Sequence, residues 1–115
     1  YLTFGGTTAD QYTGDAAKFR DEYKAKYGGE LEVYTIYGYE AANVVLAALE
    51  TASKAGAKDP VALRAGILDA LANTKDFKGV LGTWSFDKNG DTSLTTFSGT
   101  QVKSGKFEFV KVLGQ

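Results

Sequence analysis

The sequence has no histidine, no cysteine and no methionine. Without histidine there is no imidazole base, and therefore no Ser-His or Cys-His nucleophile pair. Without cysteine there is no disulfide, no thiolate zinc site and no thiol redox centre. The chain opens on Tyr1-Leu-Thr-Phe4 rather than on methionine. We therefore expect it to be part of a longer protein, with a trimmed or renumbered chain as the alternative.

The chain also has little net charge, because its 13 basic and 14 acidic side chains leave only −1. A near-neutral chain argues against nucleic acid or an anionic membrane as an electrostatic partner. No run approaches the roughly 20 apolar residues of a membrane span. The length of 115 residues and the hydrophobic content of 43% fit one soluble domain with a single core.

The most informative stretch runs from Val33 to Leu49, where strand-forming and aromatic residues give way to Ala, Val and Leu. We expect an extended segment over 31–37, then a helix from Tyr37 or Tyr39 to Ala55. Only Asn43 is polar between Ala41 and Leu49. A helix that is apolar nearly all round is buried on more than one side.

Three tyrosines, Tyr34, Tyr37 and Tyr39, crowd the start of this predicted helix. Junctions between strand and helix are where open α/β folds place ligands. The alternative is that the rings only pack in the core and at its rim. Glu40 follows in the predicted first turn, where the helix dipole favours a carboxylate, and we prefer this capping role to a catalytic one.

Two further helices have clear local signals. The first is predicted from a Thr13 cap to Tyr27, with Phe19, Tyr23 and Tyr27 on one face and Gly28 as a left-handed C-cap. The second begins at Asp59-Pro60, with Asp at the N-cap and Pro at the first helical position, and ends near Asn73-Thr74.

The remaining segments are extended. We predict a short strand over 1–4, an extended segment over 79–86, and strands over 94–102 and 106–113 joined by a turn at Ser104-Gly105. Asp87, Asn89 and Asp91 alternate as in a calcium loop. However, Gly90 stands at position four and Ser98 at position twelve, where an EF-hand needs Gly at six and Glu at twelve. We therefore predict an Asn-Gly turn and no metal.

Three motifs in this order and spacing carry a resemblance: Tyr-Gly-Tyr-Glu-Ala at 37–41, Phe-Lys-Gly-Val-Leu-Gly at 77–82 and Phe-Asp-Lys-Asn-Gly-Asp at 86–91. The chain resembles the C-terminal third of type I periplasmic binding proteins that serve branched-chain amino-acid ABC importers. The resemblance implies an α/β fold, here a fragment of two lobes with three helices and a C-terminal antiparallel hairpin. It also implies domains at 1–6 (inter-lobe crossing), 7–78 (helices of the N-terminal lobe), 79–91 (crossing) and 92–115 (hairpin of the C-terminal lobe).

In function, the resemblance implies a non-enzymatic protein without cofactor, periplasmic or extracellular and in some cases lipid-anchored, that closes on an amino acid and is recognised by an ABC permease. Tyr34 aligns with a ring that faces the cleft, and Tyr37 is a second candidate. The groups that hold the ligand's ammonium and carboxylate lie mostly upstream in the family. The hinges are placed at four glycines: Gly5, Gly6, Gly79 and Gly82.

Three other interpretations stay open from the sequence. One is a ligand-sensing receptor domain on the same fold, which only flanking segments would distinguish. Another is a fragment that self-associates through open strand edges and exposed lobe cores. The last is an independent enzyme that uses a carboxylate pair such as Asp87 and Asp91, which an exposed turn disfavours.

Overall fold

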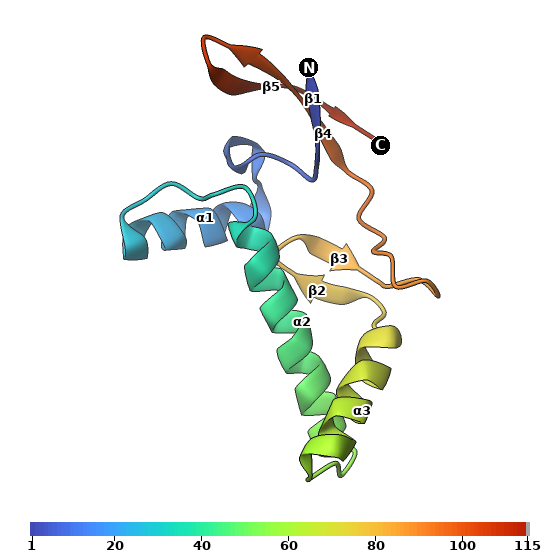
Figure 1. The fold of residues 1–115 in the computed structure, drawn as a ribbon. Coiled ribbons are helices and arrows are strands. Elements are labelled where there is room, and N and C mark those ends of the chain that lie inside the picture. Colours follow the sequence, from blue (N-terminus) through green and yellow to red (C-terminus); the bar gives the residue numbers. More distant parts are fainter. Residues whose placement is uncertain (115) are drawn as a thin grey trace. The chain divides into compact units, whose positions relative to one another are not determined.

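The computed structural model describes residues 1–114, and over that range the chain forms three α-helices and five β-strands (Figure 1). In chain order these are β1 (Leu2–Gly5), α1 (Gly14–Tyr27), α2 (Thr35–Lys54), α3 (Pro60–Ala72), β2 (Phe77–Gly79), β3 (Gly82–Trp84), β4 (Phe97–Lys103) and β5 (Lys106–Leu113). They divide into two compact units, one holding Tyr1–Val33 with the segment from Leu94 onward, the other Tyr34–Ser93.

The first unit contains an antiparallel sheet in the order β1-β4-β5 (Figure 1). The hairpin between β4 and β5 turns at Ser104 and Gly105, with φ of 50° and 76°. Two successive positive φ angles match the twist of the flanking strands. The predicted hairpin is confirmed, although β4 begins at Phe97 rather than Leu94.

Helix α1 belongs to the same unit and follows its predicted limits. It begins after Thr13 and ends at Gly28, which has a left-handed φ of 72° and donates its N–H to the Lys24 carbonyl. The rings of Phe19, Tyr23 and Tyr27 form a row, with successive centroids 6.1 and 4.8 Å apart. The predicted aromatic face of α1 is therefore confirmed.

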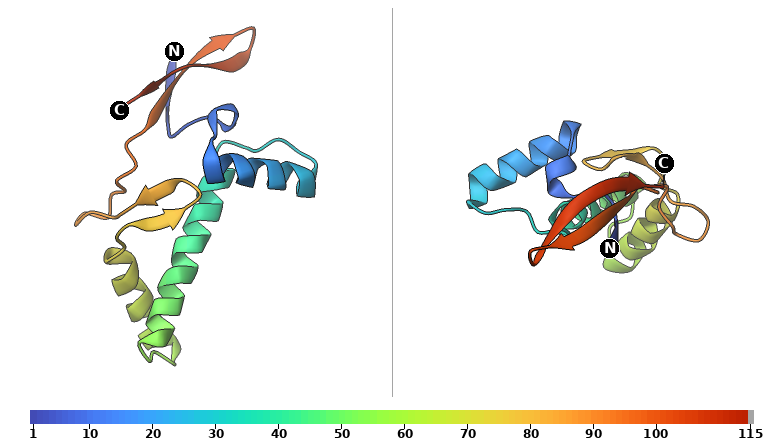
Figure 2. Two further views of the ribbon diagram at one scale, coloured as in Figure 1. Left: turned by 180° about the vertical axis from the view of Figure 1, so that it is seen from behind. Right: turned by 90° about the horizontal axis from the view of Figure 1, so that it is seen from above.

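In the second unit, α2 and α3 form a helical hairpin (Figure 2). The Asp59 carboxylate accepts hydrogen bonds from the Val61 and Ala62 backbone N–H groups at 3.0 Å, and Pro60 occupies the first turn as predicted. A Cβ added to Gly66 would lie 2.8 Å from the Ala52 Cβ. The two helices can approach this closely because small residues face each other.

Helix α2 buries one stripe, with one buried residue every four positions: Ile36, Glu40, Val44, Ala48 and Ala52. On its other faces Leu46 is 60% exposed and Val45 44% exposed. The prediction that α2 is buried on more than one side is therefore wrong for the described residues. Apolar composition shows that a helix can be buried, but the neighbouring elements decide which of its faces are.

The predicted extended segment over 31–37 is also wrong, because helical structure begins at Thr35 and residues 28–34 contain no strand. The Gly38 N–H donates to the Tyr34 carbonyl at 3.0 Å, which closes the first helical turn. Strand propensity reflects packing in a pleated sheet, and no strand of the described chain pairs with this segment. Residues from Thr35 onward, Tyr37 among them, are therefore helical.

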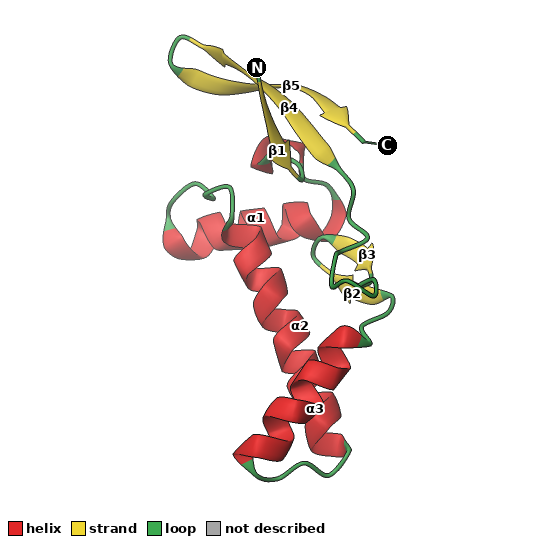
Figure 3. Cartoon of the chain, turned by 45° about the vertical axis from the view of Figure 1, so that its right-hand side comes forward, coloured by secondary structure: helices red, strands yellow, loops and turns green. Residues whose placement is uncertain are grey.

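The segment predicted as extended over 79–86 is interrupted by a turn at residues 80–81, and its strand residues belong to the short antiparallel hairpin of β2 and β3, which follows α3 in the chain (Figure 3). Gly79 pairs with Gly82, whose φ of 102° suits glycine.

No helix within residues 1–114 is both long and apolar enough to cross a bilayer.

The compact units also cut the chain at different places from the predicted domains. We expected one helical part over 7–78, whereas the structure groups α1 with the strands β1, β4 and β5. The second unit holds α2, α3, β2 and β3. The assignment of either unit to a lobe stays a prediction.

Candidate functional site

The two tyrosines singled out as binding residues lie together at the start of α2. Tyr34 occupies the N-cap position and is 72% exposed. Its ring centroid lies 6.4 Å from that of Tyr37, and the ring planes are inclined by 59°. Positions three apart share a helix face, so this pair presents two rings on one side of the helix start.

Burial raises the pKa of the Tyr37 phenol above its ordinary value, and the neighbouring Tyr34 adds to this effect. The ring is therefore partly withdrawn from water while its partner is exposed. Tyr39 lies two positions further along, and so on a different side of the helix. The structure thus brings together two of the three tyrosines that the sequence places at this junction.

Glu40 has a role that the sequence did not reveal. It lies in the buried stripe of α2 and is only 3% exposed. One carboxylate oxygen accepts a hydrogen bond from the Trp84 indole N–H at 2.7 Å, and the other accepts one from the Val80 backbone N–H at 2.9 Å. The predicted capping role in the first turn is wrong, because Glu40 lies beyond that turn and holds the β2–β3 hairpin.

A signal for this role was present in the sequence. Glu40 follows Ile36 by four positions and precedes Val44 by four, so it lies on the face that both apolar residues share. A carboxylate on an apolar face is buried only with hydrogen-bond partners. The sequence could not identify those partners, because they lie 40 and 44 positions away.

Three of the four glycines predicted as hinges have a local reason for being glycine. Gly6 has a φ of 104° and Gly82 a φ of 102°, values that residues with a side chain rarely adopt. Gly79 lies against the Glu40 carboxylate, which fills the space that a Cβ would need. Gly5 has room, since an added Cβ would lie 3.8 Å from the Phe97 ring. Their role in lobe movement stays a prediction.

The stretch from Asp87 to Asp91 forms a closed turn. The Asp87 carboxylate accepts hydrogen bonds from the Asn89 and Asp91 backbone N–H groups at 2.8 and 2.9 Å. These bonds, the one from Asp91 first, lower the pKa of Asp87. Gly90 has a φ of 85°, and Phe86 bridges to Thr92. Within residues 1–114 no three side chains of the types His, Cys, Asp and Glu are grouped so that they could hold a metal ion.

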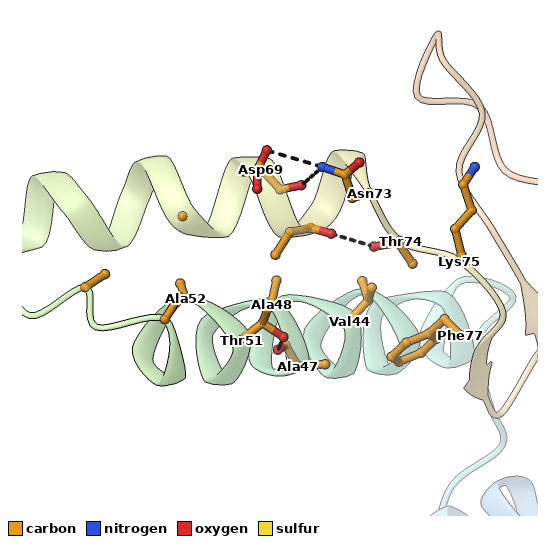
Figure 4. A pocket seen from close by; sticks show the side chains of 14 residues that line it. Val44, Ala47, Ala48, Thr51, Ala52, Asp69, Asn73, Thr74, Lys75 and Phe77 are labelled. Carbon is orange, nitrogen blue, oxygen red and sulfur yellow. Dashed lines mark hydrogen bonds between the residues drawn. The ribbon is translucent and has the colours of Figure 1, made fainter.

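A hollow of about 530 Å³ lies between α2 and α3 (Figure 4). Alanines form much of its wall. Its polar side chains are engaged within the protein: the Asn73 amide donates to the Asp69 carbonyl at 2.9 Å, and the Thr74 hydroxyl donates to the Ala70 carbonyl at 3.2 Å. The Lys75 ammonium donates to the Phe86 carbonyl at 2.8 Å. The hollow therefore offers a small-residue groove rather than a set of groups directed at a polar ligand.

Comparison with known proteins shows which family the chain belongs to. A family model described as periplasmic binding protein matches residues 1–106. The chain belongs to the periplasmic binding protein family. The predicted resemblance is therefore confirmed at the level of the family.

The relatives of this periplasmic binding protein chain carry names that refer to branched-chain amino acids. The Leu/Ile/Val-binding protein homolog 2 of Brucella abortus is 35% identical over 95 residues, which cover 80% of this chain and 22% of that protein. The chain thus spans less than a quarter of the length of this relative.

Two solved structures resemble the chain over nearly its whole length. The leucine-binding protein LivK of Thermotoga maritima is 31% identical with a TM-score of 0.73, covering 97% of this chain and 30% of that one. The branched-chain amino acid transporter substrate-binding protein LivJ of Streptococcus pneumoniae, solved with isoleucine, is 32% identical with a TM-score of 0.74, covering 98% and 30%. The predicted fold class, α/β with three helices and a C-terminal antiparallel hairpin, is confirmed.

Proposed function

We propose that this chain forms part of the solute-binding protein of an ABC importer for branched-chain amino acids, with Tyr34 and Tyr37 in the wall of the ligand cleft. The observation that carries the proposal is the ring pair at the start of α2, in which Tyr34 is exposed and Tyr37 half-buried. It occurs in a family member whose relatives are named for leucine, isoleucine and valine.

The chemistry of the pair fits such a ligand. A tyrosine ring offers an apolar face to an aliphatic side chain, and its hydroxyl can bond a polar edge. Tyr37 is half-buried, so part of its ring is already packed before the ligand arrives. Tyr34 is the exposed partner that a ligand would cover.

The proposed mechanism is closure of two lobes around the amino acid, followed by recognition of the closed form by a membrane permease. No catalytic step is involved. The hinges are proposed at Gly5, Gly6, Gly79 and Gly82. The proposed location is the periplasm or the cell exterior, with a lipid anchor in some arrangements. Replacing the four glycines with alanine should change ligand affinity and the scattering profile, and unchanged values of both would contradict the hinge assignment.

The binding proposal is tested in the full-length protein that the gene encodes, by calorimetric titration with leucine, isoleucine and valine. Replacing Tyr34 or Tyr37 with alanine should weaken binding about tenfold or more, equivalent to roughly 1.4 kcal/mol. Tyr39→Ala is the matched control, because Tyr39 has the same side chain on a different side of α2. The proposal is wrong if no branched-chain amino acid binds, or if all three variants bind like the parent.

A second candidate behaviour, self-association of the isolated chain, is favoured by the exposed apolar side chains of α2. Leu46 is 60% exposed, and Val45 and Leu49 are 44% and 36% exposed. These residues lie near one another on the helix, and exposed apolar patches favour association. Sedimentation velocity of the 115-residue chain should show oligomers that Leu46→Lys weakens. A monomer at every concentration would contradict this idea.

A further inference from the structure

The buried carboxylate of Glu40 joins α2 to the β2–β3 hairpin. Both of its oxygens accept hydrogen bonds from the hairpin, from the Trp84 indole at 2.7 Å and the Val80 backbone at 2.9 Å. A carboxylate that accepts from two donors fixes both of them in direction as well as distance. The segment from Val80 to Trp84 is therefore held against the helix at two points.

The surroundings of this carboxylate leave it little freedom. Gly79 leaves open the space that the carboxylate occupies, and any larger residue there would collide with it. Trp84 is 5% exposed and packs against the rings of Phe77 and Phe86, whose centroids lie 5.3 and 5.0 Å from its own. The indole N–H thus cannot reach water without leaving this aromatic cluster, and Glu40 is its acceptor.

The same carboxylate lies one helical turn from the proposed site. Glu40 is three positions after Tyr37, so the two residues are neighbours on the helix surface. Between them in the sequence the helix contains Gly38 and Tyr39, and Ile36 on the preceding turn is fully buried. The hairpin that Glu40 holds therefore meets α2 about one turn after Tyr37.

We propose that Glu40 is a positioning residue for amino-acid binding, an inference that rests on the function proposed above. It does not touch the ligand. By holding Val80 and Trp84 on α2, it fixes the helical turn that follows Tyr37, and this support keeps the ring pair in one arrangement. Loss of either hydrogen bond loosens this support and lowers the fraction of molecules in which the tyrosines are correctly placed.

The test uses two variants of the full-length protein that remove the same contact from opposite sides. Glu40→Gln keeps the size of the side chain but leaves one acceptor for two donors, and Trp84→Phe removes one donor. Each should weaken binding of isoleucine by about 2- to 30-fold, at a temperature where circular dichroism shows the variant folded. Glu50→Gln on the exposed side of α2 is the matched control.

A spectroscopic readout separates positioning from general damage. This 115-residue sequence contains one tryptophan, so in the isolated chain the emission of Trp84 reports directly on the contact. Glu40→Gln should move the emission to longer wavelength, whereas Glu50→Gln should leave it unchanged. Should Glu40→Gln fail to fold, Trp84→Phe still tests the binding effect.

Three results would contradict the proposed function or the positioning role of Glu40. If the parent protein binds no branched-chain amino acid, the proposed function is wrong, and the positioning role falls with it. If Tyr34→Ala and Tyr37→Ala weaken binding while folded Glu40→Gln and Trp84→Phe do not, the function stands and the positioning role is wrong. If the emission changes without a change in affinity, Glu40 supports the hairpin only.

Discussion

Replacing Glu40 with glutamine should destabilise the second unit by an amount that the structure allows us to work out. The carboxylate accepts from Trp84 Nε1 at 2.7 Å and from Val80 N at 2.9 Å, in a position only 3% exposed. A glutamine amide has one oxygen, so its NH₂ group must face one of the two donors. A buried donor left without an acceptor costs about 1–3 kcal/mol.

A double-mutant cycle separates this hydrogen bond from the other consequences of each change. Trp84→Phe removes the indole donor together with some packing, and the pair Glu40→Gln with Trp84→Phe completes the cycle. Residues in direct contact show coupling energies of about 0.5–3 kcal/mol. Because the bond is short and its acceptor is a carboxylate, we expect a coupling of at least about 1 kcal/mol.

The assay is urea unfolding of the 115-residue chain, followed by circular dichroism at a helix wavelength so that variants without tryptophan remain measurable. Glu50→Gln serves as the control, since the Glu50 carboxylate forms an exposed ion pair with Lys54 on the helix surface. A coupling below about 0.5 kcal/mol, the range found for independent sites, would show that the hydrogen bond does not hold the hairpin. Glu40 would then not anchor β2 and β3 to α2.

Two further predictions follow from the backbone. Gly79→Ala should lower the free energy of unfolding far more than Gly5→Ala, because a Cβ at residue 79 collides with the Glu40 carboxylate whereas one at residue 5 has room; equal effects in urea unfolding would contradict this steric argument. Asp59→Ala should destabilise α3 at neutral pH. Backbone hydrogen bonds, the one from Ala62 first and then that from Val61, lower the folded-state pKa of Asp59, so its contribution is present above the ordinary aspartate pKa and is lost as the pH falls through the lower folded value. In urea unfolding, the difference in the free energy of unfolding between the parent and Asp59→Ala should therefore shrink as the pH falls. A difference that stays constant down to the most acidic pH tested would show that the cap does not act through the ionised carboxylate.

Local chemistry explains which elements could be predicted from the sequence. Asp59-Pro60 begins α3 because aspartate accepts from the first free N–H groups and proline needs no hydrogen bond there. Gly28 ends α1 and Ser104-Gly105 turns the last hairpin, since both places need positive φ. In each case the residues that decide the structure lie within a few positions of one another.

The candidate site was predictable only in part. The concentration of tyrosines at residues 34–39 marks the start of α2, and in the structure the ring centroids of Tyr34 and Tyr37 are 6.4 Å apart. The capping role predicted for Glu40 is wrong, because its partners Val80 and Trp84 belong to a hairpin that the sequence indicates only as one extended segment. A contact over 40 positions depends on the fold and not on neighbouring residues.

By itself, the sequence determined where helices and turns begin and end, because caps, prolines and glycines act through hydrogen bonds and φ angles of adjacent residues. It also carried the motifs that identify the family. The tertiary structure alone decided which faces of α2 are covered, that the aromatic segment before it is not a strand, and that Glu40 faces a tryptophan. Those outcomes depend on which distant segments pack against one another, since burial and hydrogen bonding of a side chain are properties of its surroundings.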